Sequence, residues 1–262
     1  MTVDAWQADP DAAARAALGA WGAMCSGSPA GWSSQRDGLL RASSGIPFAP
    51  FNGVWSATPD IATADVLTAV EEFAAGDLPW NLQLRSGYPA ELDGELTSRG
   101  LVVTEDIPFM VLPDPAPLAA AVARSDATHR QVETLADLES LVTLMERGFG
   151  MPPELTREMF PMRLMFVGAT WITTDGEDVS TGLGFVHDGW CGVFNVATPE
   201  EHRGRGYGSA VTAHTIEAAR AAGARGAYLQ SSSMGLPVYE KLGFVTVESW
   251  RQWMLPSYAE QA

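Results

Sequence analysis

The chain has 262 residues, of which 46% are hydrophobic, 16 are basic and 32 are acidic, giving a formal net charge of −16. This length suits one large domain or two of about 130 residues, and the hydrophobic content excludes global disorder. Because binding to nucleic acid phosphates or to an anionic membrane surface needs clustered Lys and Arg, the acidic balance argues against both kinds of partner.

Cysteine and histidine are too few and too scattered to indicate a metal centre or a disulfide framework. Cys25 and Cys191 stand far apart, and the four histidines form no pair at metal-ligand spacing. The first residues carry Asp where a secretory signal has a basic and then an apolar run, and no apolar stretch approaches the ~20 residues of a membrane helix. We therefore expect a cytoplasmic protein with reduced cysteines.

Two successive parts of the chain have the same order of predicted elements. In the first, periodicity predicts a strand near 50–57, a helix over 61–75, a strand over 79–85, a shorter helix over 89–99 and a strand over 101–112. In the second, the corresponding elements are strand 190–197, helix 206–222, strand 226–232, helix 234–242 and strand 244–255.

Further elements precede this succession in the second half. A strand near 128–133 is followed by an amphipathic helix and then by a Met- and Phe-rich helix over about 153–166. Strands 168–174 and 179–187 meet across Asp175-Gly176-Glu177-Asp178, which is a strong hairpin pattern.

Short words recur at a constant spacing, which indicates an internal duplication. Phe51-Asn52 returns as Phe194-Asn195, and Arg99-Gly100 as Leu242-Gly243; 194 − 51 and 243 − 100 both give 143. The alternative is chance similarity between short apolar words.

A proline-rich run separates the two halves. Residues 111–118 hold three prolines, which exclude a regular helix or a central strand at that point. The chain is therefore predicted to have a first domain over 1–115, a Pro- and Ala-rich connector over 116–127 and a second domain over 128–262.

The most informative local feature is the run His202-Arg-Gly-Arg-Gly-Tyr-Gly-Ser-Ala210, between strand 190–197 and the long helix. Its three alternate glycines let the backbone approach a ligand without interference from Cβ atoms. Their N–H groups, with those of the first helical turn, form a cradle for an anion that the helix dipole strengthens. Arg203 and Arg205 add positive charge, so we expect a ligand that carries a diphosphate.

Two other phosphate-binding loops do not fit this run. A dinucleotide loop needs G-x-G-x-x-G, and Ser209 takes the third glycine position. A Walker loop needs a lysine, and the run contains none.

The motif Arg203-Gly204-Arg205-Gly206-Tyr207-Gly208 resembles the Q/R-x-x-G-x-G/A motif of the GNAT superfamily of acyl-CoA-dependent N-acyltransferases. Residues 193–198 are similar to that family's bulged fourth strand, and residues 234–244 to its closing helix and turn. The resemblance covers about 128–255. The first half is similar only in element order, as in tandem members with a degenerate N-terminal copy.

The resemblance implies an α/β fold with two GNAT-like halves, each a mixed, mostly antiparallel sheet flanked by helices. A splayed pair of strands in the second half would form the wedge for acyl-CoA. It further implies acetyl-CoA or another acyl-CoA as the co-substrate, with no metal.

Residues of the second half can be assigned to this co-substrate by their match to the family. The diphosphate would be bound by amides of Arg203, Gly204, Arg205, Gly206, Tyr207 and Gly208 and by the helix start at Ser209. The pantetheine arm would pair with Asn195, Val196 and Ala197, and Ser231 would line its slot. Alternatively, Asn195 and Ser231 are polar residues at strand ends.

Tyr239 matches the tyrosine that usually faces the leaving thiolate in the family. A phenol with a pKa near 10 protonates a thiolate of pKa near 8.5 only uphill, by roughly 2 kcal/mol, so a hydrogen bond is the better supported role. The alternative is an aromatic ring that packs under the sheet.

The general base is less well indicated. Strand 191–196 offers no carboxylate, in contrast to some family members. Glu158, with Glu154, is a weak candidate on the following helix, and a water relay or an acceptor amine of low pKa is the alternative.

The first half lacks the features of a donor site. Asp60 and Asp65 stand where the loop would bind phosphate, so one donor site per chain is expected. The leading hypothesis is transfer of an acetyl or short acyl group to a small-molecule amine, by a monomer or a homodimer. The alternatives are a catalytically silent acyl-CoA-binding module and an acyltransferase that takes its donor from an acyl carrier protein.

Overall fold

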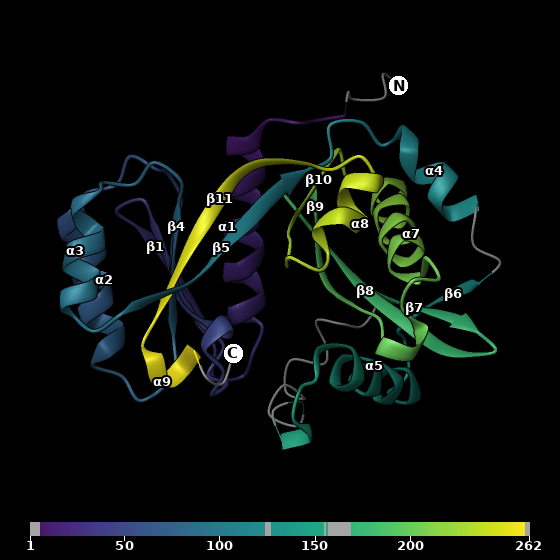
Figure 1. Cartoon of the computed structure of the whole chain (residues 1–262), viewed down its shortest axis with the longest axis horizontal. Coiled ribbons are helices and arrows are strands. Elements are labelled where there is room, and N and C mark those ends of the chain that lie inside the picture. Colours follow the sequence, from purple (N-terminus) through teal and green to yellow (C-terminus); the bar gives the residue numbers. More distant parts are fainter. Residues whose placement is uncertain (1–5, 124–126, 155, 157–168, 260–262) are drawn as a thin grey trace. The chain divides into compact units, whose positions relative to one another are not determined.

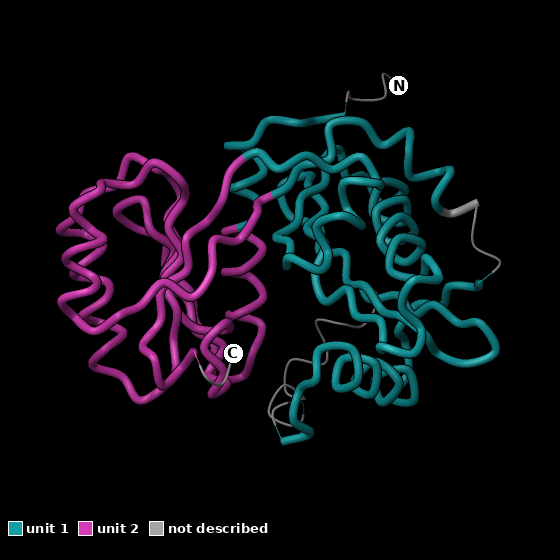
Figure 2. Tube along the Cα trace, in the orientation of Figure 1, with its two compact units in different colours: residues 1–17, 110–247 teal, residues 18–109, 248–262 magenta. Residues whose placement is uncertain are grey.

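The computed structural model describes residues 6–123, 127–154, 156 and 169–259 (Figure 1). The chain divides into two compact units, shown in Figure 2. Unit 1 contains residues 1–17 and 110–247, and unit 2 contains residues 18–109 and 248–262. No described helix is long and apolar enough to span a membrane.

The two units alternate along the sequence and do not follow the predicted linear boundaries. Strand β5 (Val102–Val111) begins in unit 2 and ends in unit 1, whereas β11 (Val245–Met254) begins in unit 1 and ends in unit 2. The N–H of Leu112 donates to the carbonyl of Ala227 at 3.0 Å within unit 1. Residues 250–253 pair with β4 of unit 2. Such long-range pairing leaves no local pattern in the sequence.

Unit 2 is built on a sheet with the strand order β1-β2-β3-β4-β11-β5. Its strands are β1 (Trp32–Arg36), β2 (Leu39–Ser43), β3 (Asn52–Ser56), β4 (Asn81–Arg85), β11 and β5. Strands β3 and β4 are parallel, and the pairs β1–β2, β2–β3 and β4–β11 are antiparallel. A short 3-10 helix, η1 (Ala49–Phe51), precedes β3, and helix α9 (Pro256–Ala259) follows β11.

Helices α2 (Thr63–Ala74) and α3 (Glu91–Ser98) contribute to the hydrophobic core of unit 2. Val66, Ala69 and Val70 are three and four residues apart, so they lie on one face of α2, and all are buried. They share this core with β2, β3 and β4, where alternate side chains point to the same face. Burying one such aliphatic side chain stabilises the fold by about 1.5–3 kcal/mol.

Unit 1 is built on strands in the order β10-β9-β8-β7-β6, with β5 beside β10. The strands are β6 (Thr128–Gln131), β7 (Thr170–Asp175), β8 (Glu177–His187), β9 (Trp190–Ala197) and β10 (Gly226–Gln230). The helices are α4 (Ala116–Ala123), α5 (Leu135–Phe149), η3 (Glu200–His202), α7 (Tyr207–Ala221) and α8 (Leu236–Lys241).

Helix α7 lies unusually close to β8. A Cβ atom at Gly184 would come 2.5 Å from Cγ2 of Thr215, so only glycine permits this approach. Helix α5 is fixed at its start by a capping box between Thr134 and Asp137 and ends at Gly150, which has a φ of 69°. In Figure 1, α7 and α5 lie on opposite sides of β7 and β8.

The elements predicted from periodicity are confirmed within a few residues. Strand 190–197 agrees with β9, and helix 206–222 corresponds to α7. The closing strands 101–112 and 244–255 correspond to β5 and β11. The helix predicted over 153–166 falls almost entirely outside the described residues.

The predicted connector over 116–127 differs from the structure, where α4 occupies most of it. Pro117 stands at the second residue of the helix, where its missing N–H has no helical partner to lose. The carboxylate of Asp114 accepts the N–H of Ala116 at 2.9 Å, and Leu118 is buried in the core of unit 1. The proline pattern therefore marked the start of a helix.

The first fifty residues carry elements that the sequence did not predict. Helix α1 (Pro10–Ser26) passes from unit 1 into unit 2, and β1 and β2 form a hairpin. In unit 2 the indole of Trp21 stacks on Trp55 with ring centroids 5.9 Å apart.

Candidate functional site

Strands β9 and β10 of unit 1 pair over a short length only. Gly226, Ala227 and Tyr228 pair in parallel with residues 190, 191 and 192. Strand β9 then continues to Ala197 and β10 to Gln230, beyond this three-residue register. The parallel register therefore ends before the last residues of either strand, as predicted for a splayed pair.

A β-bulge lies in β9 at the same point. Leu183 of β8 pairs with Phe194, and Thr181 pairs with Ala197, so two residues of β9 are accommodated opposite one of β8. Asn195 has a φ of 51°, in the left-handed region that Asn tolerates better than most residues. The predicted bulge is therefore confirmed. Asn195 is the residue within it that has the left-handed backbone conformation.

The glycine loop, residues 203–208, connects η3 to α7. Gly204 and Gly206 have φ values of 76° and 86°, and a Cβ at either would meet nothing within 4 Å. Helix α7 begins at Tyr207 with Gly206 as its N-cap. Among the described residues, none accepts a hydrogen bond from the six consecutive N–H groups of 204–209.

These free N–H groups suit an anionic ligand. The positive end of the α7 dipole adds to them, because the first amides of a helix have no partner within it. The open space above the two glycines allows a ligand to reach the backbone directly. The loop thus has both the donors and the access that a diphosphate requires.

The side chain of Arg203 does not extend freely from the loop. Its Nε donates to the carbonyl of Thr198 and its Nη2 to the carbonyl of Gly148, both at 3.0 Å. These bonds join the loop to the end of β9 and to the last turn of α5. Arg205 is exposed and hydrogen-bonds to Tyr207.

Tyr207 fixes the other end of the loop. Its ring is buried, and its hydroxyl donates to Oδ2 of Asp175 in β7. This hydrogen bond raises the pKa of Tyr207 and keeps the phenol neutral. Tyr207 thereby ties the start of α7 to the β7–β8 hairpin.

Tyr239 lies in α8 against the core of unit 1. Its ring meets Phe244 edge to face with centroids 6.0 Å apart, and no described residue hydrogen-bonds to its hydroxyl. Burial raises the pKa of Tyr239 to about 12. A Cβ at Gly235 would lie 2.8 Å from the tyrosine ring and 3.3 Å from Oγ of Ser231, so these side chains converge at the end of β10.

Ser231 is buried, and its hydroxyl donates to the carbonyl of Ser232 at 2.8 Å. Cys191 is fully buried in the core, and burial raises the pKa of its thiol to about 12. Such a thiol is protonated at neutral pH and is a poor nucleophile.

The predicted bases are not brought to the site by the described structure. Glu158 lies outside the described residues, and Glu154 is exposed. The carboxylate of Glu146, on α5, is engaged in a hydrogen bond. Its Oε1 accepts the hydroxyl of buried Thr156 at 2.5 Å, near the end of α5.

Comparison with known proteins bears directly on these elements. Residues 167–246 match the acetyltransferase (GNAT) domain. The matched range contains β9, the glycine loop, α7, β10 and α8, and it supports membership of the GNAT superfamily and transferase activity.

Solved structures are similar to this chain over nearly its whole length. A GCN5-related N-acetyltransferase from Kribbella flavida is 18% identical with a TM-score of 0.70, covering 95% of this chain and 96% of that chain. A putative GNAT-family acetyltransferase from Novosphingobium aromaticivorans DSM 12444 is 16% identical with a TM-score of 0.57, covering 94% and 99%. A GCN5-related N-acetyltransferase from Sphaerobacter thermophilus is 17% identical with a TM-score of 0.56, covering 85% and 75%.

These similarities confirm the predicted fold class, a mixed α/β fold with a large, mostly antiparallel sheet flanked by helices. A search of curated proteins finds no match to this chain. Among the described residues, no group of three or more His, Cys, Asp or Glu side chains is arranged to bind a metal ion.

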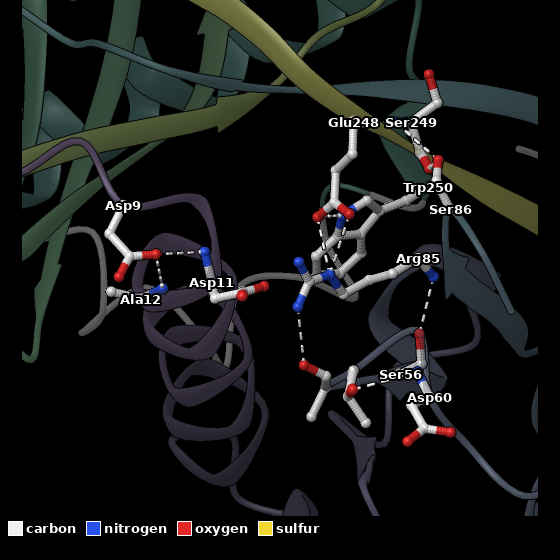
Figure 3. Close-up of polar contacts among 12 residues, drawn as sticks. Asp9, Asp11, Ala12, Ser56, Asp60, Arg85, Ser86, Glu248, Ser249 and Trp250 are labelled. Atoms are coloured by element: carbon white, nitrogen blue, oxygen red, sulfur yellow. Dashed lines mark hydrogen bonds and ion pairs between the residues drawn. The ribbon is translucent and has the colours of Figure 1, made fainter.

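Unit 2 differs from unit 1 where its own parallel strands end. Strands β3 and β4 pair through Trp55 and Gln83, and beyond this point Arg85 keeps them joined. Its N–H donates to Oγ of Ser56 at 2.8 Å and its Nη1 to the carbonyl of Ala57 at 3.0 Å (Figure 3). The backbone at this end of β3 is therefore occupied by contacts within the chain.

Proposed function

We propose that the protein is an N-acyltransferase that moves an acetyl or short acyl group directly from acyl-CoA to the amine of a small molecule. The observation that carries this proposal is the row of six consecutive N–H groups of 204–209, which have no acceptor among the described residues and follow a strand that extends beyond its parallel register. The GNAT match over 167–246 supports acyl transfer as the general activity.

In this proposal the glycine loop binds the diphosphate of CoA through the amides of 204–208 and through Ser209. The pantetheine arm adds to β9 along Asn195, Val196 and Ala197, where the bulge turns the backbone away from the ladder. The carbonyl of Ala197 already accepts a hydrogen bond from the hydroxyl of Ser180, at 2.9 Å. The other backbone groups of Asn195, Val196 and Ala197 would therefore bind the arm.

Tyr239 is proposed to donate a hydrogen bond to the departing thiolate. With a pKa of about 12, against roughly 8.5 for a thiol, complete proton transfer would be uphill by about 5 kcal/mol. The phenol therefore stays protonated throughout and stabilises the developing negative charge as a donor.

The acceptor amine must lose a proton to become a nucleophile. An alkylammonium with a pKa near 10.4 is neutral in only about one molecule in 2,500 at pH 7, which corresponds to roughly 4.6 kcal/mol. The proton is proposed to pass to solvent or to a carboxylate of the segment after α5, where Glu158 remains the prediction from sequence.

We also propose that the chain is a tandem protein with a degenerate upstream copy and a single donor site. The order β3, α2, β4, α3, β5 in the first half parallels β9, α7, β10, α8, β11 in the second. In unit 2, Asp60 and Asp65 flank the start of α2, and Arg85 holds the ends of β3 and β4 together. Carboxylates at this position would repel a diphosphate.

Release of free thiol from acetyl-CoA, measured with a panel of small-molecule amines, tests the proposed activity. Steady amine-dependent release supports the transferase. Binding of CoA without turnover for any amine would identify a silent acyl-CoA-binding module, and turnover with an acylated carrier protein alone would reassign the donor.

A further inference from the structure

The glycine loop is fixed by side chains at its two ends, and among the described residues none accepts a hydrogen bond from the backbone N–H groups between them. Arg203 holds the upstream end, and Tyr207 holds the downstream end through Asp175. Between them, Gly204 and Gly206 have no side chain, and a Cβ on either would have no neighbour within 4 Å. The conformation of the loop therefore depends on these two anchors and on whatever binds its amides.

The upstream anchor belongs to two elements at once. The planar guanidinium of Arg203 spans the carbonyl of Thr198, just after β9, and that of Gly148, in the last turn of α5. An ion pair between Arg147 and Glu201 makes a second link between the same two segments. The first link runs from α5 to the first residue of the loop, and the second runs to Glu201, immediately before the loop.

The last turn of α5 borders the end of β9. A Cβ at Gly148 would come 2.8 Å from Cβ of Ala197 and 3.2 Å from the nitrogen of Thr198. The turn itself is closed by the N–H groups of Gly150 and Met151, which both donate to the carbonyl of Glu146. Any movement of this turn changes the surroundings of the strand that the pantetheine arm is proposed to use.

We infer that Arg203 is a positioning residue that couples the glycine loop to the last turn of α5. When a diphosphate fixes the amides of 204–208, the adjacent backbone of Arg203 is fixed as well, and its guanidinium then holds the carbonyl of Gly148 in place. The ordering of the turn is thus linked to donor binding through loss of conformational freedom. This inference rests on the proposed function, because it takes CoA as the ligand of the loop.

The linkage works in both directions. Because coupling free energies are reciprocal, contacts that order the α5 turn also raise the affinity of the loop for CoA. An acceptor that binds against the α5 turn would then bind better to the CoA complex than to the free protein. Arg203 therefore acts through the position of α5, whereas the amides of the loop contact the phosphates.

Hydrogen exchange with and without CoA tests this coupling, using the amides of 149–151 as reporters of the α5 turn and those of 204–209 as reporters of the loop. In the wild type, CoA is expected to slow exchange in both segments, by about fivefold or more at 149–151. In Arg203→Gln the loop should still be protected, whereas the effect at 149–151 should disappear. Arg205→Gln removes the same charge from the loop, and no described residue of α5 contacts Arg205, so the protection at 149–151 should persist in this variant.

Protection at 149–151 that is equal in Arg203→Gln and the wild type would overturn the coupling and leave CoA binding intact. Absence of protection at 204–209 in the wild type would overturn the proposed function and this inference together. If Arg203→Gln does not fold, Arg203→Lys keeps the charge but replaces the two donor nitrogens, Nε and Nη2, by a single flexible ammonium, so the effect of CoA at 149–151 is expected to weaken.

Discussion

Arg85 of β4 and Glu248 of β11, 163 residues apart in the sequence, form a buried ion pair in unit 2. The Nε of Arg85 lies 2.8 Å from Oε1 of Glu248, and their side chains are 5% and 11% exposed (Figure 3). The same Oε1 accepts the indole N–H of Trp250 at 2.8 Å. This pair binds the last strand of the chain to a strand of the first half.

Glu248→Ala is expected to destabilise the protein by about 1–3 kcal/mol, because it removes a largely buried carboxylate that accepts hydrogen bonds from Nε of Arg85 and from the indole N–H of Trp250. Urea unfolding followed by fluorescence measures the loss. The matched control is Glu95→Ala, which breaks the exposed Arg99–Glu95 pair and should cost less than about 1 kcal/mol. Equal losses in the two variants would show that burial of the Arg85–Glu248 pair does not increase its contribution to the free energy of unfolding.

Gly206→Val is expected to weaken CoA binding by about tenfold or more. The φ of 86° at Gly206 is unfavourable for valine by about 1–3 kcal/mol, and relaxation of the loop would turn its amides away from the diphosphate. Calorimetric titration with CoA measures the effect. Gly223→Val, at a φ of 101° just after the far end of α7, introduces a similar strain away from the loop and its anchors and should leave the affinity for CoA nearly unchanged.

Tyr239→Phe is expected to lower kcat by about ten- to a hundredfold and to leave the affinity for CoA and the unfolding free energy nearly unchanged. The ring would still pack against Phe244, and the hydroxyl has no partner among the described residues to lose. The reason for the slower turnover is loss of a donor to the leaving thiolate. Tyr258→Phe, in unit 2, is the control and should leave kcat unchanged. If kcat is unchanged in Tyr239→Phe as well, Tyr239 has only a packing role.

Acid is expected to destabilise the protein through His129. This ring stacks on His214 of α7 at 4.3 Å, and burial, with the neighbouring imidazole, lowers its pKa from 6.5 to about 4. Between these values the unfolded chain binds a proton that the folded chain does not, so stability falls as the pH drops from 6.5 to 4. The difference between the two pKa values corresponds to about 3 kcal/mol. This is an upper bound for the contribution of His129, because its ring is only half-buried and solvent screens it.

Unfolding free energies measured from pH 7 to pH 4 check this expectation. His129→Phe keeps an aromatic ring in the stack and should reduce the pH dependence over this interval; His214, whose pKa is also lowered by burial, should retain its own contribution. His187→Gln, which replaces a histidine elsewhere in the same unit, should leave the pH dependence of the unfolding free energy unchanged. A slope that is unchanged in His129→Phe would show that other groups cause the acid sensitivity.

The sequence predicted the elements whose pattern is local. The alternation of apolar and small residues placed β9 within its observed bounds, and the alternate glycines placed the start of α7. The bulge at Asn195 was also predicted, on the resemblance to a bulged strand. In each case a short run of residues fixes the backbone conformation without help from distant parts of the chain.

The features that the sequence did not predict depend on distant partners. The passage of β5 and β11 between the units follows from pairing over more than a hundred residues, which periodicity does not record. Arg203 was assigned to phosphate for its charge, whereas its guanidinium binds the carbonyls of Thr198 and Gly148. Helix α4 was missed because prolines interrupt its first turn only.

A crystal structure with acetyl-CoA tests the central claim most directly. The account predicts one molecule per chain, with diphosphate oxygens about 2.7–3.2 Å from amide nitrogens of 204–208 and the thioester between the ends of β9 and β10. A molecule of CoA bound at the ends of β3 and β4 in unit 2, or a glycine loop that makes no contact with the diphosphate, would contradict it.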